Sequence, residues 1–144
     1  MSTAEKKQVQ LIDARGPRFS AAITTLVLAA ALVTQSSVLI AIQLVVFAIG
    51  AFAGPAKTPY AFLFKKFVKP RLKGEVPTED ARPPQFAQSV GLIFAVVALA
   101  GSLLSIPALF TVAVGFALFA AFLNAAFNFC LGCEIYLLAL RAVK

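Results

Sequence analysis

Two long stretches of this chain carry no charged side chain, and they restrict its fold more than any other feature. No lysine, arginine, aspartate or glutamate occurs from Phe19 to Ala56 or from Pro83 to Cys133. A helix that crosses a bilayer needs roughly 20 apolar residues, because the hydrocarbon core is about 30 Å thick. Each stretch is too long for one such helix, so each predicts a helical hairpin. The sequence therefore predicts an all-α, integral membrane four-helix bundle.

Polar residues and a proline locate the tips of the two hairpins. Thr34-Gln35-Ser36-Ser37 is the polar cluster of the first stretch, and Ser105-Ile106-Pro107 divides the second. Proline fits the first turn of a new helix, because its missing N–H has no partner there. The predicted spans are about Phe19–Val33, Val38–Ala53, Phe86–Leu104 and Ala108–Phe129.

The beginning of each stretch repeats the same motif. Ala14-Arg15-Gly16-Pro17-Arg18-Phe19 aligns with Ala81-Arg82-Pro83-Pro84-Gln85-Phe86. Duplication of a two-helix unit predicts two parallel repeats, related by an axis along the membrane normal. A cleaved signal peptide is the alternative for the first segment, which the repeat disfavours. We expect a single membrane domain, with repeat one at 13–56, an interfacial helix and loop at 57–80, and repeat two at 81–144.

The basic residues lie before the first span, between the second and third, and after the fourth, whereas the hairpin tips carry no charge. Under the positive-inside rule, this pattern predicts a multi-pass protein of the bacterial cytoplasmic (plasma) membrane, with both termini cytoplasmic. The net charge of +7 then forms a one-sided basic collar that suits anionic lipid head groups. A nucleic-acid partner is not expected, because no soluble domain is present to read a groove.

The segment Pro59–Lys69 predicts a cytoplasmic amphipathic helix that lies on the membrane surface. On a helical wheel, apolar Tyr60, Leu63, Phe64, Phe67 and Val68 share one face. The opposite face carries lysines, and Pro70 is expected to end the helix. The predicted lipid-surface residues are Lys65, Lys66, Lys69, Arg71 and Lys73. A helix that docks a protein partner is the alternative. The following Gly74–Asp80 predicts a loop.

Cys130 and Cys133 are the only cysteines, and they stand where the last apolar stretch ends. At the cytoplasmic boundary a structural disulfide is not expected, and a CxxC pair there is more typical of catalysis or metal binding. A zinc site needs four ligands, and the chain has no histidine. We therefore expect no metal and no cofactor, with a four-cysteine site shared across a dimer as the alternative.

A redox or sulfur-relay role fits this spacing. One cysteine can attack a disulfide or persulfide, and the other can resolve it, with Gly132 giving the backbone freedom to close the ring. If the helix breaks near Gly132 and restarts, Cys130 lies at a helix N-terminus, which favours its thiolate. If the helix continues unbroken, Glu134 lies one turn from Cys130. The alternative to both is that the cysteines are buried packing residues.

Four amides lie within the predicted spans. Asn124 and Asn128 share a helix face that points away from Cys130 on an ideal helix, and Gln43 and Gln88 lie in other spans. Because an unpaired amide is costly in lipid, we expect them to hydrogen-bond between helices, with substrate contact as the alternative. Gly50-x-x-x-Gly54 permits close packing within one copy or between copies, so a homo-oligomer is possible.

Three segments resemble a bacterial membrane family designated domain of unknown function 4395, common in actinobacteria. They are Asp13–Phe19, Arg82–Gln88 and the motif Leu123-Asn124-Ala125-Ala126-Phe127-Asn128-Phe129-Cys130-Leu131-Gly132-Cys133-Glu134-Ile135-Tyr136. The resemblance implies a four-helix membrane protein. It also implies an association with thioredoxin-like and rhodanese-like sulfurtransferase proteins, which would connect the chain to sulfur metabolism.

The leading hypothesis is a membrane thiol-disulfide or persulfide relay at the cytoplasmic face. Cys130 is the expected attacking thiol and Cys133 the resolving thiol, although the pattern also permits the reverse. The expected supporting residues are Asn124, Asn128, Glu134 and Tyr136. Two other hypotheses are a non-catalytic membrane anchor that recruits a soluble partner, and a passage for a small sulfur compound.

Overall fold

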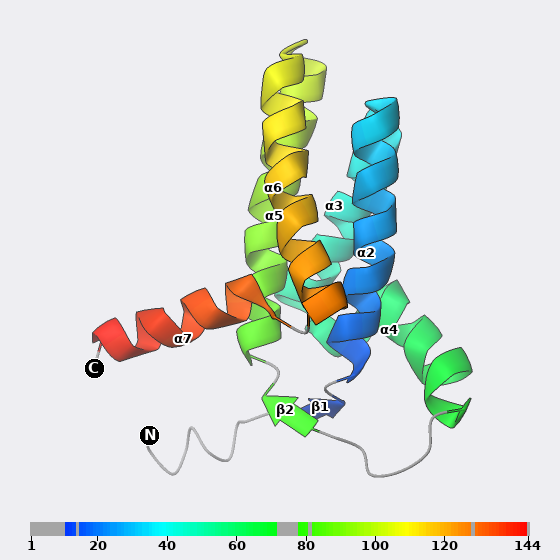
Figure 1. The fold of residues 1–144 in the computed structure, drawn as a ribbon, viewed down its shortest axis with the longest axis vertical. Helices are drawn as coiled ribbons and strands as arrows, with labels where there is room; N and C mark the ends of the chain where they lie inside the picture. The colour runs from blue at the N-terminus through cyan, green and yellow to red at the C-terminus, as the bar shows by residue number, and fades with distance from the viewer. Residues whose placement is uncertain (1–10, 14, 72–77, 81, 128, 144) are drawn as a thin grey trace.

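The computed structural model describes residues 11–13, 15–71, 78–80, 82–127 and 129–143, and within them the fold is helical apart from one pair of short strands (Figure 1). The helices are α2 (Arg15–Thr34), α3 (Ser37–Phe52), α4 (Pro59–Leu63), α5 (Arg82–Leu103), α6 (Pro107–Phe127) and α7 (Leu131–Val143). A 3₁₀ turn at Pro55–Lys57 precedes α4, and a π-helical turn at Phe64–Val68 and a 3₁₀ turn at Lys69–Arg71 continue it. The strands are β1 (Leu11–Asp13) and β2 (Thr78–Asp80).

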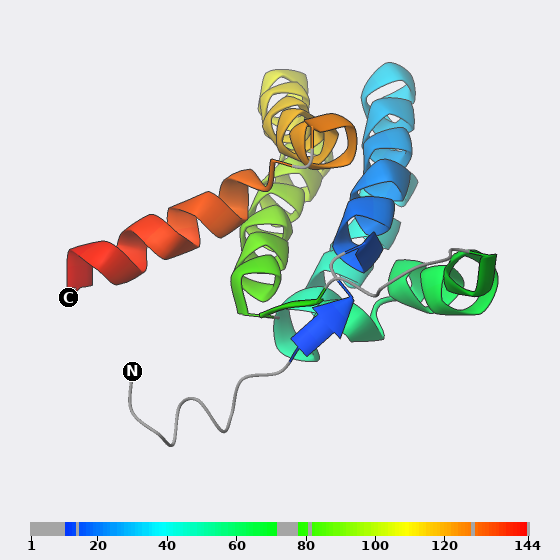
Figure 2. The same ribbon diagram turned by 60° about the horizontal axis from the view of Figure 1, so that its bottom comes forward.

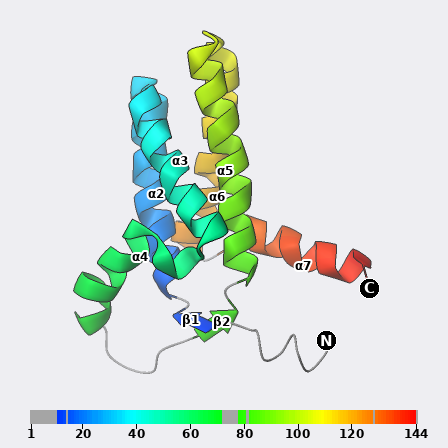
Figure 3. The same ribbon diagram turned by 180° about the vertical axis from the view of Figure 1, so that it is seen from behind.

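Four of the helices pack side by side as two hairpins, α2–α3 and α5–α6 (Figures 1 and 3). The hairpins contact each other crosswise, because α2 packs against α6 and α3 packs against α5. Both hairpin turns lie at one end of this bundle, and the strand pair lies at the other. We call the latter the strand end. Helices α4 and α7 run sideways from the strand end in different directions.

Three helices are long and apolar enough to cross a membrane, namely α2, α5 and α6. Helix α3 is also apolar but has 16 residues, which at about 1.5 Å per residue gives roughly 24 Å. The sequence predicted four spans. Three of the four corresponding helices are long enough to cross a membrane, and α3 is shorter. These helices identify the chain as a candidate multi-pass membrane protein.

The two hairpin turns lie where the polar residues and the proline predicted them. Gln35 and Ser105 adopt positive φ angles of 52° and 60°, the conformation that reverses the chain at the end of a helix. Ser36 caps α3, since its side chain accepts a hydrogen bond from the N–H of Leu39 at 3.3 Å. Pro107 is the first residue of α6. Both predicted turns are confirmed.

Helices α2 and α5 begin about one turn earlier than predicted, at Arg15 and Arg82. Each contains proline in its first turn, where the fixed φ angle suits a helix and no backbone N–H is needed. The two starting arginines occupy corresponding positions in the repeated motif. The motif therefore contributes to the helices themselves and does not only precede them.

The strand pair was not predicted, since residues 78–80 fall in the expected loop. Strands β1 and β2 are antiparallel, with Leu11 opposite Asp80, Ile12 opposite Glu79 and Asp13 opposite Thr78. Glutamate and aspartate are uncommon in strands, so this segment carries no strand signal. Ile12 and Glu79 precede Arg15 and Arg82 by the same number of residues. The central pair of the two strands is therefore formed by corresponding positions of the two repeats.

The apolar core lies in the half of the bundle nearer the hairpin turns. Its residues come from all four helices and include many alanines, which let the backbones approach closely. They are Leu28, Ala31, Ile40, Ala98, Phe110, Ala113, Val114, Ala117 and Ala121. This core closes the bundle at that end, and Ala121 extends it past the middle of α6.

A buried polar chain connects α4 to the bundle. The Tyr60 hydroxyl donates a hydrogen bond to Gln43 Oε1 at 2.8 Å, and Gln43 Nε2 donates to Thr24 Oγ1 at 3.5 Å. Gln43 is fully buried. The expected interhelical role of this glutamine is therefore observed, with partners on α2 and α4.

The segment after Pro59 is less regular than the predicted amphipathic helix. Of the predicted apolar face, Tyr60 and Phe64 are buried, whereas Leu63 and Phe67 are exposed. The π-helical turn at Phe64–Val68 has more residues per turn and so rotates Phe67 away from its position on the wheel. Phe67 consequently lies beside Lys66, whose Nζ is 5.6 Å from its ring centre.

The two glycines of Gly50-x-x-x-Gly54 have different roles. A Cβ at Gly50 would lie 2.7 Å from Gln88 Cδ, so Gly50 allows α3 and α5 to pack closely within one copy. Gly54 faces open space and has a φ of 116°, which favours glycine as α3 ends.

Candidate functional site

The two cysteines lie where the chain turns sharply out of the bundle. Helix α6 ends at Phe127, and α7 begins at Leu131 and crosses the strand end, packed against α5 (Figure 2). Cys130 immediately precedes α7, and Cys133 lies in its first turn. Of the two geometries that the sequence left open, the structure adopts the one in which the helix breaks and restarts.

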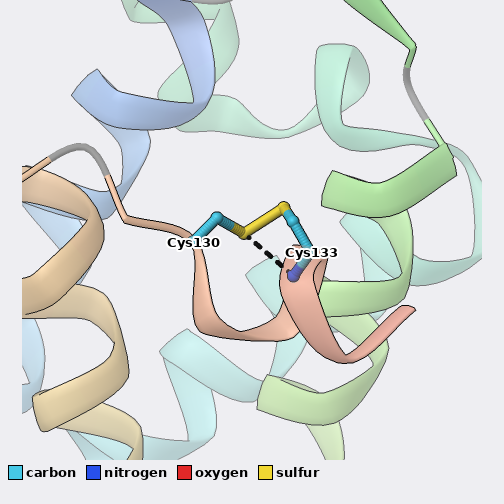
Figure 4. Close-up of a disulfide and its surroundings, with 2 residues drawn as sticks. All are labelled: Cys130 and Cys133. Carbon is cyan, nitrogen blue, oxygen red and sulfur yellow. Dashed lines mark hydrogen bonds between the residues drawn. A yellow bond between two sulfur atoms is a disulfide. The ribbon is translucent and has the colours of Figure 1, made fainter. Parts of the chain in front are cut away.

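The two sulfur atoms form a disulfide, and the Cα atoms are 5.1 Å apart (Figure 4). Cys130 also caps α7. Its Sγ accepts a hydrogen bond from the backbone N–H of Cys133 at 3.2 Å, and its carbonyl oxygen accepts one from the N–H of Glu134 at 3.0 Å. The CxxC spacing therefore closes a small ring around the N-terminus of a helix.

This position distinguishes the two sulfurs chemically. The first N–H groups of a helix have no partner within the helix and carry partial positive charge. When the disulfide is reduced, these groups stabilise a thiolate on Cys130, which already faces one of them. Cys133 lies inside the first turn and supplies that N–H rather than receiving it. The geometry therefore favours Cys130 as the sulfur that carries negative charge.

Gly132 brings the pair against the bundle. A Cβ on this residue would lie 2.7 Å from both Cα and Cβ of Ala87 on α5, closer than real Cβ contacts allow. The sequence suggested that Gly132 supplies backbone freedom, but it lies in a regular helical turn and its role is close packing. The same interface includes Phe86 and Tyr136, whose rings are 5.5 Å apart.

A cavity of about 570 Å³ lies beside the disulfide. It is bounded by α2, α5, α6 and the beginning of α7, with one side chain from α3. Its apolar wall includes Phe47, Phe94, Phe116 and Phe119, and both cysteines are part of its lining. The cavity adjoins the alanine-rich core, since Ala117 and Ala121 belong to both. Ligand pockets in proteins commonly have this size and this mainly apolar character.

A few polar groups line the cavity. Gln88 is one of them, and its buried Oε1, which has no hydrogen-bond partner among the described residues, lies toward Gly50 of α3. The Asn124 side chain and Glu134 are also part of the lining. Arg18 lines the cavity and donates from Nε to the carbonyl oxygen of Ala125 at 3.1 Å, which satisfies an acceptor in the last turn of α6.

The predicted supporting residues separate into different places. Asn124 lies on the cavity with the cysteines, contrary to the ideal-helix expectation, because α6 ends before Cys130 and α7 folds back. Glu134 is exposed and also lines the cavity. Tyr136 packs on Phe86 and is not part of the cavity lining. Asn128 lies outside the described residues.

The predicted lipid-surface residues belong to the α4 segment. Lys65 and Lys66 are exposed, and Lys69 is partly buried. Lys65 Nζ donates a hydrogen bond to the carbonyl oxygen of Ala56 at 3.1 Å. Arg71 is the last residue of the 3₁₀ turn, and Lys73 lies outside the described residues.

Arg18 and Gln88 line the cavity but were not among the predicted site residues. Arg18 was counted only as a charge before the first span, and Gln88 only as an interhelical hydrogen-bonding residue. A usable signal for Gln88 was its position one turn before Gly91, because small residues and amides within a span are enriched where helices contact each other. Nothing comparable indicates that Arg18 reaches α6.

Within the parts of the chain that the structure describes, no three histidine, cysteine, aspartate or glutamate side chains are grouped so that they could hold a metal ion.

The chain has no match among the curated proteins or among the solved structures. The sequence profile of one family, described as a domain of unknown function, DUF4395, matches residues 12–141. This range contains all the described helices except the end of α7, together with the cysteine pair and every residue that lines the cavity. The resemblance noted in the sequence is therefore confirmed, and the chain belongs to the DUF4395 family.

Proposed function

We propose that this chain is a four-helix protein of the bacterial cytoplasmic membrane that performs thiol–disulfide exchange through Cys130 and Cys133 at the cytoplasmic face. The observation that carries the proposal is the closed cysteine pair at the N-terminus of α7. A dithiol that can close to a disulfide, and that holds one sulfur where a thiolate is stabilised, has the two properties that exchange requires.

The charge distribution supports this orientation. Arg15, Arg18 and Arg82 lie at the starts of α2 and α5, and Lys65 and Lys66 follow α4, so all five lie toward the strand end. The two hairpin turns at the opposite end carry no charged residue. Since α3 returns antiparallel to α2, it completes the second crossing in this proposal despite its length. The symmetric strand register supports a duplicated unit whose axis runs along the membrane normal.

The exchange consists of two substitutions at sulfur. A thiolate of a reduced partner attacks one sulfur of the Cys130–Cys133 disulfide, which forms a mixed disulfide and releases the other cysteine as a thiol. The second thiol of the partner then attacks the mixed disulfide. The partner leaves oxidised, and this chain keeps both thiols and the two electrons. Each step runs equally in reverse, so the direction depends on the supply of oxidant.

The proposed partner is a soluble protein of the thioredoxin-like or rhodanese-like class that carries two thiols able to close to a disulfide. Support comes from the position of the pair at the strand end, partly buried but not enclosed. We favour thiol–disulfide exchange over a persulfide relay because the two sulfurs are bonded to each other in a disulfide.

Trapping of a mixed disulfide tests the proposal. In Cys133→Ser, the Cys130 thiolate can attack the disulfide of an oxidised partner, which is the exchange in reverse, but this chain then lacks the second thiol that resolves the mixed disulfide. A covalent complex that reductant dissolves should therefore accumulate in membranes. The matched variant Cys130→Ser should trap several-fold less, and the double variant none. If none of the variants traps a protein, and reduced thioredoxin fails to open the disulfide of the native chain, the proposed function is wrong.

A second candidate function is membrane anchoring of a partner through the α4 segment. The observation that favours it is the exposed group formed by Phe62, Lys66 and Phe67, in which Lys66 Nζ lies 5.8 Å and 5.6 Å from the two ring centres. Exposed aromatic and basic side chains together suit a lipid head-group region. Lys65→Gln with Lys66→Gln should abolish function under this alternative and leave trapping by Cys133→Ser unchanged under the first.

A further inference from the structure

The disulfide and the apolar cavity share a wall, and this juxtaposition suggests where the electrons go. Cys130 and Cys133 line a space that is otherwise surrounded mainly by apolar and aromatic side chains of α2, α5 and α6. All three of these helices are candidate membrane spans. An apolar molecule dissolved in the lipid phase is therefore a suitable occupant, and in this cavity it would lie beside the sulfur atoms.

We propose that the cavity binds a membrane quinone, which oxidises the Cys130–Cys133 dithiol; this inference rests on the proposed function. A quinone has an apolar ring and tail that match the phenylalanine-rich wall. It also accepts the number of electrons that a dithiol releases on closing to a disulfide, so one molecule completes one cycle.

The polar lining fits the ring oxygens of such a ligand. Gln88 and Asn124 provide amide groups among the residues that line the cavity. An amide N–H can donate to a quinone carbonyl oxygen, and an amide oxygen can accept from the hydroxyl of the hydroquinone. A saturated lipid chain can do neither. These amides therefore favour a quinone over an acyl chain as the occupant.

The reaction balances without any other reagent. Two S–H bonds break, one S–S bond forms, and both electrons and both protons pass to the quinone, whose two carbonyl oxygens become hydroxyls. Cys130 is the sulfur that reacts first as a thiolate, because the helix N-terminus stabilises its charge. The hydroquinone then returns to the bilayer.

A binding experiment tests the cavity independently of the redox step. Purified full-length protein in nanodiscs is titrated with decylubiquinone, with decylbenzene as a competitor that has a similar tail and no ring oxygens. We expect saturable binding that decylbenzene displaces poorly. Displacement by decylbenzene as effective as by the quinone itself would overturn the proposal, since the cavity would then be a lipid pocket only.

Two pairs of variants locate the binding. Gln88→Leu should weaken quinone binding about tenfold, whereas Ser89→Ala, on the same helix but outside the cavity lining, should bind normally. Ala120→Phe fills the cavity and should abolish binding, whereas Ala126→Phe, on the exposed side of α6, should not. If Gln88→Leu and Ala120→Phe both fold and bind like the native chain, the cavity assignment is wrong.

An anaerobic reaction separates this inference from the proposed function. The reduced protein is mixed with decylubiquinone, and quinone loss and thiol loss are followed together; equal amounts of hydroquinone and disulfide are expected. In parallel, the native disulfide is treated with reduced thioredoxin. Exchange with thioredoxin but no oxidation by quinone would refute the quinone and leave the proposed function standing. Quinone binding without any exchange would refute the function instead.

Discussion

At the scale of single residues, the structure makes two similar cysteines unequal. Both are partly buried, but Cys130 receives the Cys133 N–H on its sulfur and Cys133 receives no corresponding bond among the hydrogen bonds of the described residues. The inequality comes from the break between α6 and α7, which makes Cys130 the capping residue of α7. Spacing alone does not reveal this, because it depends on where one helix ends.

We therefore predict that Cys130 alkylates faster than Cys133. After reduction, the single-cysteine variant Cys133→Ser should react with a maleimide roughly fivefold faster at neutral pH than Cys130→Ser, because a helix terminus and a hydrogen bond together contribute about 1 kcal/mol to thiolate stability. Quenched labelling followed by mass spectrometry gives both rates. In denaturing detergent the difference should vanish, and equal rates in the folded protein would contradict the assignment.

A second prediction at this scale concerns Tyr60. Burial raises the pKa of this hydroxyl above its ordinary value of 10.0. Above that value the unfolded tyrosine ionises while the folded one stays neutral, so the unfolded state binds fewer protons. The stability contribution is complete below the ordinary pKa and is lost as pH rises through the raised pKa.

Thermal unfolding in detergent on either side of pH 10.0 checks this. The native protein should lose more stability on this pH increase than Tyr60→Phe, because other titrating groups are common to both. Below that pH the variant should itself be less stable by about 1–2 kcal/mol, since Gln43 Oε1 loses its donor. Identical pH profiles would show that burial does not perturb Tyr60.

At the scale of elements, the placement of α7 depends on its close approach to α5. Gly132 and Ala87 meet with no room for another carbon atom. Backbone atoms cannot move aside as a side chain can, so a methyl group at Gly132 must displace the helix. The position of the cysteines against the cavity therefore depends on a residue that has no chemistry of its own.

Gly132→Ala should destabilise the protein by about 1–3 kcal/mol, as overpacking in a tight contact does. It should also slow disulfide exchange, because the cysteines move with α7. Thermal unfolding and the rate of reduction by thioredoxin measure the two effects. Gly115→Ala is the matched control: it lies in α6 with nothing within 4 Å of the added carbon, so it should be neutral or slightly stabilising. Similar behaviour of the two variants would exclude the packing explanation.

At the scale of the whole molecule, the two hairpins place β1 and α7 at the same end of the bundle (Figure 1). The positive φ residues Gln35 and Ser105 mark the turns at the far end. If α3 crosses the membrane in the proposed orientation, these turns face outward and α7 lies inside. If α3 does not cross, the α2–α3 hairpin does not bring the chain back to the cytoplasmic side.

Single cysteines in the Cys130→Ser, Cys133→Ser background test this topology. Ser37→Cys, next to the first turn, and Ile106→Cys, in the second, should react with a membrane-impermeant maleimide on intact spheroplasts. Ala142→Cys, on α7, should react only after permeabilisation. External labelling of Ala142→Cys would reverse the orientation and remove the cytoplasmic site, whereas protection of Ser37→Cys would show that α2 does not carry the first turn across the membrane.

Several features followed from the sequence because their causes are local. The apolar stretches specify helices, and Thr34–Ser37 and Pro107 specify where the chain reverses. The lack of charge at the hairpin turns distinguishes that end of the bundle from the basic end. The CxxC spacing likewise predicted that the two sulfurs lie within reach of one another. Each of these depends on residues close together in the chain, so neighbouring side chains suffice to determine it.

Only the tertiary structure decided the rest, because it depends on contacts between distant segments. The pairing of Ile12 with Glu79, the packing of Gly132 on Ala87, and the orphaned oxygen of Gln88 each require that two separate helices or strands be brought together. The cavity is of the same kind, since four helices surround it and no local pattern encodes it. The sequence by itself determined the four helices of the bundle and the thiol pair, whereas the packing of these helices and of α7 determined what the thiols face.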